Sequence, residues 1–195
     1  MGRWWKCQSI INERNLSTPL SISSRTRNIC GKTKLFKLLY FLDFEHPAQT
    51  GRSVTGLDYH AWPKGPVPVD LFNEIDEIDN GLADDNLKDA MEISKRKISE
   101  GKEMPSIVPK REFSKEHFTK RESRLLEKFG REYAGSRAQE MIEATHLENL
   151  PWHEIYEVGG LRQQAIPYEL ALKKSEYGQL MKNVIDNKEF EENYA

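Results

Sequence analysis

The sequence predicts a mainly α-helical fold of the α+β class: a compact helical domain around a buried central helix, with a small two-stranded β-hairpin. The first observation is the stretch Gly31–Phe44, where leucines recur at the i, i+3, i+4 and i+7 spacing of one helical face and aromatic residues fill the adjacent face. A helix that is apolar on nearly all sides is normally buried, because one neighbouring layer cannot cover it. The second observation is a pair of segments rich in β-branched residues, 90–98 and 107–113, which predicts the hairpin.

Composition is typical of one moderately polar domain. The chain has 195 residues, 37% of them hydrophobic and 31% charged, which fits one domain with tails or small additions. The formal net charge of -2 does not support a dedicated nucleic-acid binder, which usually carries a clear basic excess. Two cysteines, Cys7 and Cys30, are too few for a disulfide framework or a four-cysteine zinc site. With no apolar run typical of a signal peptide, these features predict a reduced, cytoplasmic protein.

The first half of the chain is predicted to place the central helix after a leader. Residues 1–30 carry more basic than acidic residues and no clear helical pattern, which predicts an atypical, poorly ordered segment. Pro47 ends the central helix, and Leu57–Trp62 alternates enough to be a short strand or an extended segment. The prolines of the following PKGPVP stretch are expected to exclude regular structure until the next helix, Val69–Asn80, which has Pro68 in its first turn.

The second half is predicted to be helical. Thr119 and Glu122 have the spacing of a capping box, which begins a helix with a leucine-rich buried face. Gly135-Ser136 ends that helix, and a further helix is expected over Arg137–His146. A short helix, the IPYELAL segment and a terminal helix follow, over residues 152–157, 166–172 and 177–185, before an acidic end at 189–195. The predicted regions are a leader of residues 1–30, a domain of residues 31–172, and a C-terminal helix and acidic tail of residues 173–195.

No complete catalytic or metal-binding motif is present in the sequence. Gly31-Lys32-Thr33 resembles the end of a phosphate-binding loop, but that loop needs a glycine at the position of Thr26. His146-Leu147-Glu148 matches part of the zinc-deaminase motif, whose P-C-x-x-C is missing. The five histidines do not pair at metal-ligand spacing, and the sequence places no partner for a reactive Cys30 thiol. We predict no enzymatic activity, no cofactor and no metal, and we interpret His146 as a hydrogen-bonded structural histidine.

Four sequence blocks, in order, carry a family resemblance: GKTKLFKLLYFLDF, GRSVTGLDYHAWPKGPVP, THLENLPW and IPYELAL. Together they resemble the Panacea domain, the SocA-like antitoxin domain of bacterial and phage toxin–antitoxin pairs, over roughly residues 31–172. The resemblance implies a mostly helical fold with a small β element and no catalytic activity. It implies neutralisation of a cognate toxin, encoded by a neighbouring gene, through direct binding. The alternative that it implies is a proteolytic adaptor that delivers the toxin to a Clp-type protease. Family members usually carry an amphipathic helix before the first block, and residues 10–30 do not show one.

The resemblance also supplies candidate partner-binding residues. These are Lys34, Lys37, Tyr40, Asp43, Trp62, Gly65, Pro66, Val67, Pro68, His146, Trp152, Ile166, Pro167 and Tyr168. The residues themselves leave two roles open for Trp62, as an exposed anchor for a partner or as a core residue. For Asp43 they favour a place in the scaffold, paired with a lysine or arginine, over contact with the partner. A membrane or nucleic-acid partner is not expected.

Overall fold

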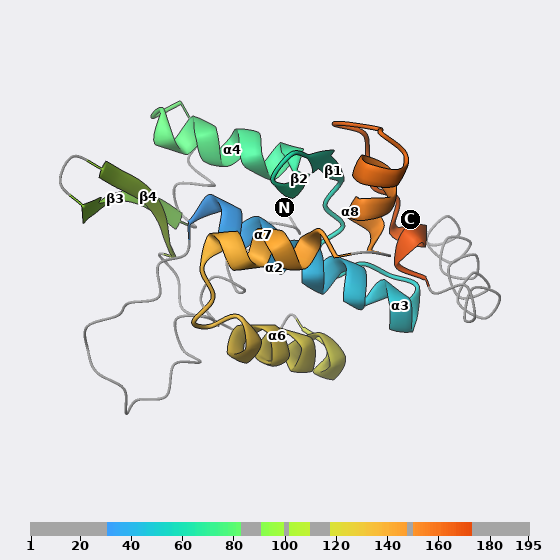
Figure 1. The fold of residues 1–195 in the computed structure, drawn as a ribbon. Coiled ribbons are helices and arrows are strands. Elements are labelled where there is room, and N and C mark those ends of the chain that lie inside the picture. Colours follow the sequence, from blue (N-terminus) through green and yellow to red (C-terminus); the bar gives the residue numbers. More distant parts are fainter. Residues whose placement is uncertain (1–30, 83–90, 100–101, 110–117, 148–149, 173–195) are drawn as a thin grey trace.

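The computed structural model describes residues 31–82, 91–99, 102–109, 118–147 and 150–172 (Figure 1). Within these residues the protein is mainly helical with a small β content, which confirms the predicted fold class. The predicted leader, residues 1–30, and the predicted terminal helix, residues 177–185, lie outside the described residues. None of the described helices is long and apolar enough to cross a membrane.

The central helix α2 runs over Lys32–Glu45, with Gly31 as its N-cap residue. Every residue from 34 to 44 is buried except Phe41, which is partly buried. Figure 1 shows α7 crossing α2, with α4 and α6 on opposite sides. The apolar pattern therefore predicted both the helix and its central place. The short helix α3, Pro47–Thr50, follows almost directly, because a proline in the first turn lacks only an N–H that the helix would not use.

The predicted strand near Leu57–Trp62 forms, and a second strand forms where the prolines were expected to exclude regular structure. Strand β1, Tyr59–Trp62, pairs antiparallel with β2, Gly65–Pro68. In this register Tyr59 lies opposite Pro68 and Ala61 lies opposite Pro66. The prediction for the PKGPVP stretch is therefore wrong.

The hydrogen bonds of β1 explain why prolines are tolerated in β2. Ala61 bonds through both its N–H and its C=O to the segment 163–166, at 2.9 and 2.8 Å, and the Tyr59 C=O accepts from the same segment at 2.7 Å. In an antiparallel pair, residues outside the mutually bonded positions direct their backbone groups away from the partner strand. Pro66 and Pro68 occupy these positions in β2, so their missing N–H removes no bond to β1.

A second hairpin, β3 (Met91–Ser99) with β4 (Lys102–Pro109), confirms the predicted one with different bounds. The sequence predicted a polar connection over residues 99–105, but Pro105 already lies in β4, opposite Lys95. Ile107 is buried, and the hairpin contacts α2 and α4. The backbone ladder extends past the β-branched residues to Ser99 and Lys102, so the pattern predicted strands that end too early.

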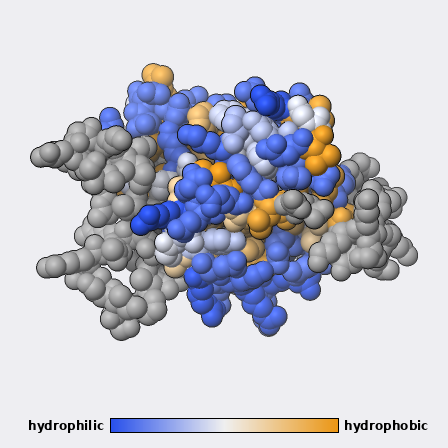
Figure 2. Space-filling model, in the orientation of Figure 1, coloured by the Kyte–Doolittle hydropathy of each residue, from blue (hydrophilic) through white to orange (hydrophobic). Residues whose placement is uncertain are grey.

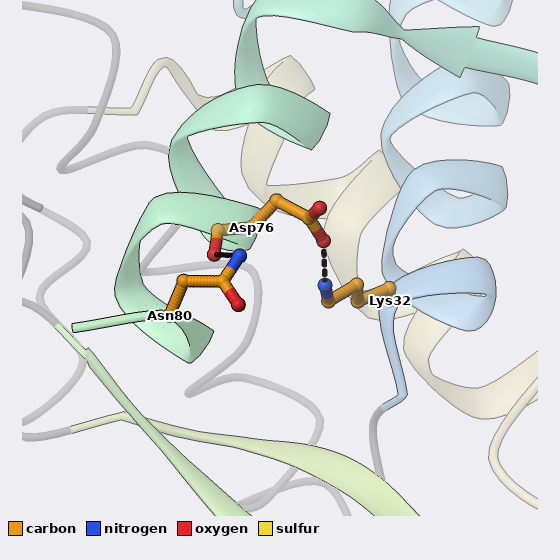
Figure 3. A network of polar contacts seen from close by, with 3 residues as sticks. All are labelled: Lys32, Asp76 and Asn80. Atoms are coloured by element: carbon orange, nitrogen blue, oxygen red, sulfur yellow. Dashed lines mark hydrogen bonds and ion pairs between the residues drawn. The ribbon is translucent and has the colours of Figure 1, made fainter. Parts of the chain in front are cut away.

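Helix α4 spans Val69–Asp79, with Pro68 as its N-cap residue rather than in its first turn. An ion pair joins it to the start of α2, with 2.5 Å between Lys32 Nζ and Asp76 Oδ1 (Figure 3). At the end of α4 the Asn80 side chain donates to the Asp76 backbone carbonyl at 2.8 Å. The ion pair thus joins the last turns of α4 to the beginning of the central helix, and the Asn80 bond closes the end of α4.

The helices of the second half follow the predicted order. Helix α6, Lys120–Glu132, begins with the predicted capping box: the Glu122 N–H donates to Thr119 Oγ1 at 3.2 Å, and the Thr119 N–H donates to Glu122 Oε2 at 2.7 Å. The remaining elements are α7 (Ala138–Thr145), α8 (Pro151–His153), a π-helical turn (Glu154–Val158) and a 3₁₀ turn (Tyr168–Ala171). Their order agrees with the predicted segments, except that α7 begins one residue later and ends one residue earlier, and the predicted helix 152–157 consists of α8 and the π-helical turn.

Candidate functional site

Lys37 lies inside the protein, between α2 and β2. Its side chain is 1% exposed, and its Nζ donates to the Pro66 carbonyl at 2.7 Å. Burial lowers the pKa of Lys37 to about 7, because the ammonium group loses the hydration that favours its charged form. This lysine therefore holds β2 against the central helix, and its head group is not available to a partner.

At Gly65, β2 lies close to side chains of both α2 and α7. Its φ is +89°, and a Cβ at this position would lie 2.6 Å from Thr145 Oγ1 and 2.8 Å from Lys37 Nζ. Thr145 is fully buried, and its hydroxyl donates to the Ile142 carbonyl at 2.7 Å. Only glycine combines this backbone conformation with the absence of a Cβ.

Trp152 joins three of the sequence blocks. It is 1% exposed, its N–H donates to Tyr40 Oη at 3.3 Å, and its indole Nε1 donates to the Trp62 carbonyl at 3.0 Å. The His146 ring stacks on the indole, with 3.8 Å between centroids and 8° between planes. Trp62 is partly buried and its ring lies 5.2 Å from that of Phe72, so it is neither a fully exposed anchor nor a fully buried residue.

His146 is held by stacking rather than by the hydrogen bond that the sequence suggested. Its Nε2 is buried without a hydrogen-bond partner among the described residues. Burial lowers the pKa of His146 and nearby Lys37 acts in the same direction, whereas Glu157 and Glu143 raise it. The neutral imidazole is thereby favoured, which suits a ring that lies flat on an indole.

Asp43 is fully buried and organises the chain that leads into β1. Its carboxylate accepts from the N–H groups of Val54 and Thr55, at 2.9 and 2.7 Å, from the Thr55 hydroxyl, and from Tyr59 Oη at 2.8 Å. Burial raises the pKa of Asp43, and these hydrogen bonds oppose that rise. The expected lysine or arginine partner is wrong in kind, because the described donors are amides and hydroxyls. The place of Asp43 is inside the scaffold.

The remaining candidates also contribute mainly to packing. Lys34 is 8% exposed, with its Nζ 3.4 Å from the Ala134 carbonyl. Val67 and Ile166 are buried, and Tyr168 Oη donates to the Leu57 carbonyl at 2.5 Å. Among all the candidates only Pro167 is exposed, while Trp62, His146 and Tyr168 are partly buried. The motif thus marks a connected scaffold, and its use as a partner-binding surface stays a prediction.

The described residues form no group of three or more His, Cys, Asp or Glu side chains that could hold a metal ion. The buried polar groups of the motif are instead engaged with backbone carbonyls, amides and aromatic rings. These contacts position segments of the chain relative to one another.

Sequence reasoning missed the charged outer face of α6. Its basic residues are Lys120, Arg121, Arg124, Lys128 and Arg131, and all five are exposed. Figure 2 shows a continuous hydrophilic surface over this helix. On the opposite side of α2, the helix α4 exposes the acids Asp70, Glu77 and Asp79. The sequence signal for this face is the recurrence of basic residues at helical spacing, whereas the prediction used only the apolar residues of the opposite, buried face of α6.

The described scaffold is that of a small helical domain built from buried motif residues, and comparison with known families identifies the class of protein to which it belongs. The family model "Antitoxin SocA-like, Panacea domain" matches residues 35–153, more than half of the chain. The protein therefore belongs to the SocA-like antitoxin family of Panacea-domain proteins. Searches of curated proteins and of solved structures find no significant match.

Proposed function

We propose that this protein is the antitoxin of a toxin–antitoxin pair and neutralises its cognate toxin in the cytoplasm by binding it directly. The observation that carries the proposal is the family match over residues 35–153. The arrangement of Lys37, Gly65 and Trp152 supports it, because their buried contacts serve to build one rigid body from separate sequence blocks. A rigid body without a described catalytic group acts through its surfaces.

Growth and co-purification test this proposal together. The toxic gene that neighbours this one is expressed alone and with the antitoxin, and the tagged antitoxin is then purified. Rescue of growth with retention of the toxin is expected. Leu39→Ala is a suitable negative control, because Leu39 is fully buried and its truncation costs about 2–5 kcal/mol of stability. Growth rescue without any retained toxin would contradict neutralisation by direct binding.

The adaptor alternative concerns the fate of the toxin after binding. Its sequence motivation, the acidic end at residues 189–195, lies outside the described residues, and no described feature favours it. The two mechanisms differ in the half-life of the toxin. Direct neutralisation leaves that half-life unchanged when the Clp-type protease is removed, whereas an adaptor requires it to lengthen.

A further inference from the structure

The amino-terminal half of α6 carries three exposed cations, Lys120, Arg121 and Arg124. Lys120, Arg121 and Arg124 have no hydrogen-bond or ion-pair partner within the described parts of the chain. The two basic residues farther along the helix differ from them. Lys128 lies 3.0 Å from Glu45, and Arg131 lies 3.3 Å from Glu127. Within α6, the cations that have no such partner among the described residues therefore lie in its first two turns.

This position is unfavourable for the helix itself. The amino-terminal end of a helix has a partial positive charge from its unpaired N–H groups, so cations there reduce helix stability and anions increase it. The capping box of Thr119 and Glu122 already completes the start of α6. Lys120 and Arg121 lie in the first turn, next to that cap, and oppose the electrostatics of the helix, which indicates a role outside folding.

The surroundings of the three cations define the kind of partner. Residues 120 to 124 span four helical rises, about 6 Å. The rest of the basic stripe is neutralised by Glu45 and Glu127, and α4 exposes acids on the opposite side of α2. A long nucleic acid would extend beyond the free cations toward repelling carboxylates, and the whole chain has a net charge of -2. A short acidic segment of a protein fits this small patch.

We propose that Lys120, Arg121 and Arg124 form the docking surface for an acidic segment of the cognate toxin, a proposal that rests on the proposed antitoxin function. Carboxylates of the toxin bind the two guanidinium groups through paired N–H donors and bind the lysine as a point charge. Because the cations are solvent-exposed, this attraction accelerates encounter and decreases with ionic strength.

The test is the triple charge reversal Lys120→Glu, Arg121→Glu and Arg124→Glu in the full chain. Glutamate at positions 120 and 121 is favourable in the first turn of the helix, and glutamate at position 124 lies four residues before Lys128, which offsets its repulsion from position 120, so the variant is expected to melt near the wild-type temperature. Its affinity for the toxic product of the neighbouring gene is expected to fall at least about tenfold at low salt, and to lose its salt dependence. The charge-conserving variant Lys120→Arg, Arg121→Lys and Arg124→Lys is expected to retain the salt dependence, and to lose less affinity than the charge reversal because only the paired N–H donors are lost.

A scattered triple reversal, Lys64→Glu, Lys95→Glu and Arg162→Glu, is the matched control. These three residues are exposed, and their reversal changes the net charge equally. It is expected to bind the toxin within about twofold of wild type. Equal binding by both reversed variants would overturn the proposal and leave the antitoxin function standing, whereas failure of the wild type to bind the toxin would overturn both. Binding of an RNA duplex that the α6 reversal abolishes, with toxin binding intact, would also overturn it.

Discussion

Replacement of Gly65 by alanine probes the closest approach within the scaffold. The φ of +89° requires alanine to enter a conformation that costs about 1–2 kcal/mol. The new Cβ would also lie 2.6 Å from Thr145 Oγ1 and 2.8 Å from Lys37 Nζ, an overpacking that costs about 1–3 kcal/mol. The sum is a loss of about 2–5 kcal/mol, which at about 3 °C for each kcal/mol lowers the melting temperature by about 6–15 °C.

Two other glycines separate the backbone cost from the steric cost. Gly81 and Gly160 also have positive φ, +75° and +64°, but a Cβ at either would meet nothing within 4 Å. Alanine at these positions is expected to cost only the conformational part, about 1–2 kcal/mol. The three variants are compared by urea denaturation, in which the midpoint and its slope give the free energy of unfolding.

A double variant tests whether Thr145 is the obstructing group. Thr145→Ala removes the nearest atom, so Gly65→Ala should cost about 1 kcal/mol less in the Thr145→Ala background than in wild type. Strict additivity would show that Thr145 does not obstruct the new methyl group. A Gly65→Ala variant as stable as Gly81→Ala would refute the steric reasoning as a whole.

Three further predictions concern buried or capping groups. Asp43→Asn replaces one carboxylate oxygen by an NH₂ group, so that only one oxygen remains to accept from the surrounding N–H and O–H donors, and the variant should lose about 2–4 kcal/mol of stability. An unchanged melting temperature would contradict the scaffold role. Lys37 has a pKa of about 7 in the folded protein and an ordinary value of 10.5, so the unfolded chain binds more protons between these values and stability rises with pH across that window. Lys37→Met should remove this rise, which is at most about 5 kcal/mol and is measured by comparing the free energy of unfolding at pH 7 and pH 10. If the free energy of unfolding of the variant still rises with pH as in wild type, the lysine is not the titrating group. Thr119→Ala should cost about 1 kcal/mol in urea denaturation by removing the cap of α6, and Thr119→Ser should retain it; equal losses in both would exclude the hydroxyl as the cause.

The features that the sequence predicted are those with a local signature. The central helix could be located because its apolar residues surround it, and the start of α6 because a capping box needs only Thr119 and Glu122. The partners of Asp43 could not be predicted, because two of them are backbone N–H groups that any sequence supplies. The basic face of α6 also has a local signature, because its lysines and arginines recur at helical spacing in the sequence.

The strand β2 was missed for a more general reason. The exclusion of proline from strands assumes that both sides of the strand make hydrogen bonds. Here β1 uses its other side for the segment 163–166, so the prolines of β2 fall where no ladder bond is needed. A sequence does not show which side of a strand is paired, and the rule therefore failed at this position.

The prolines of β2 have a consequence for how the protein meets other chains. The free edge of β2 lacks N–H donors at positions 66 and 68, and the Pro66 carbonyl on that edge is occupied by Lys37 Nζ. An extended segment of another protein cannot extend this sheet there, because strand addition needs alternating donors and acceptors. The free edge of β2 is thereby protected from edge-to-edge aggregation with other chains.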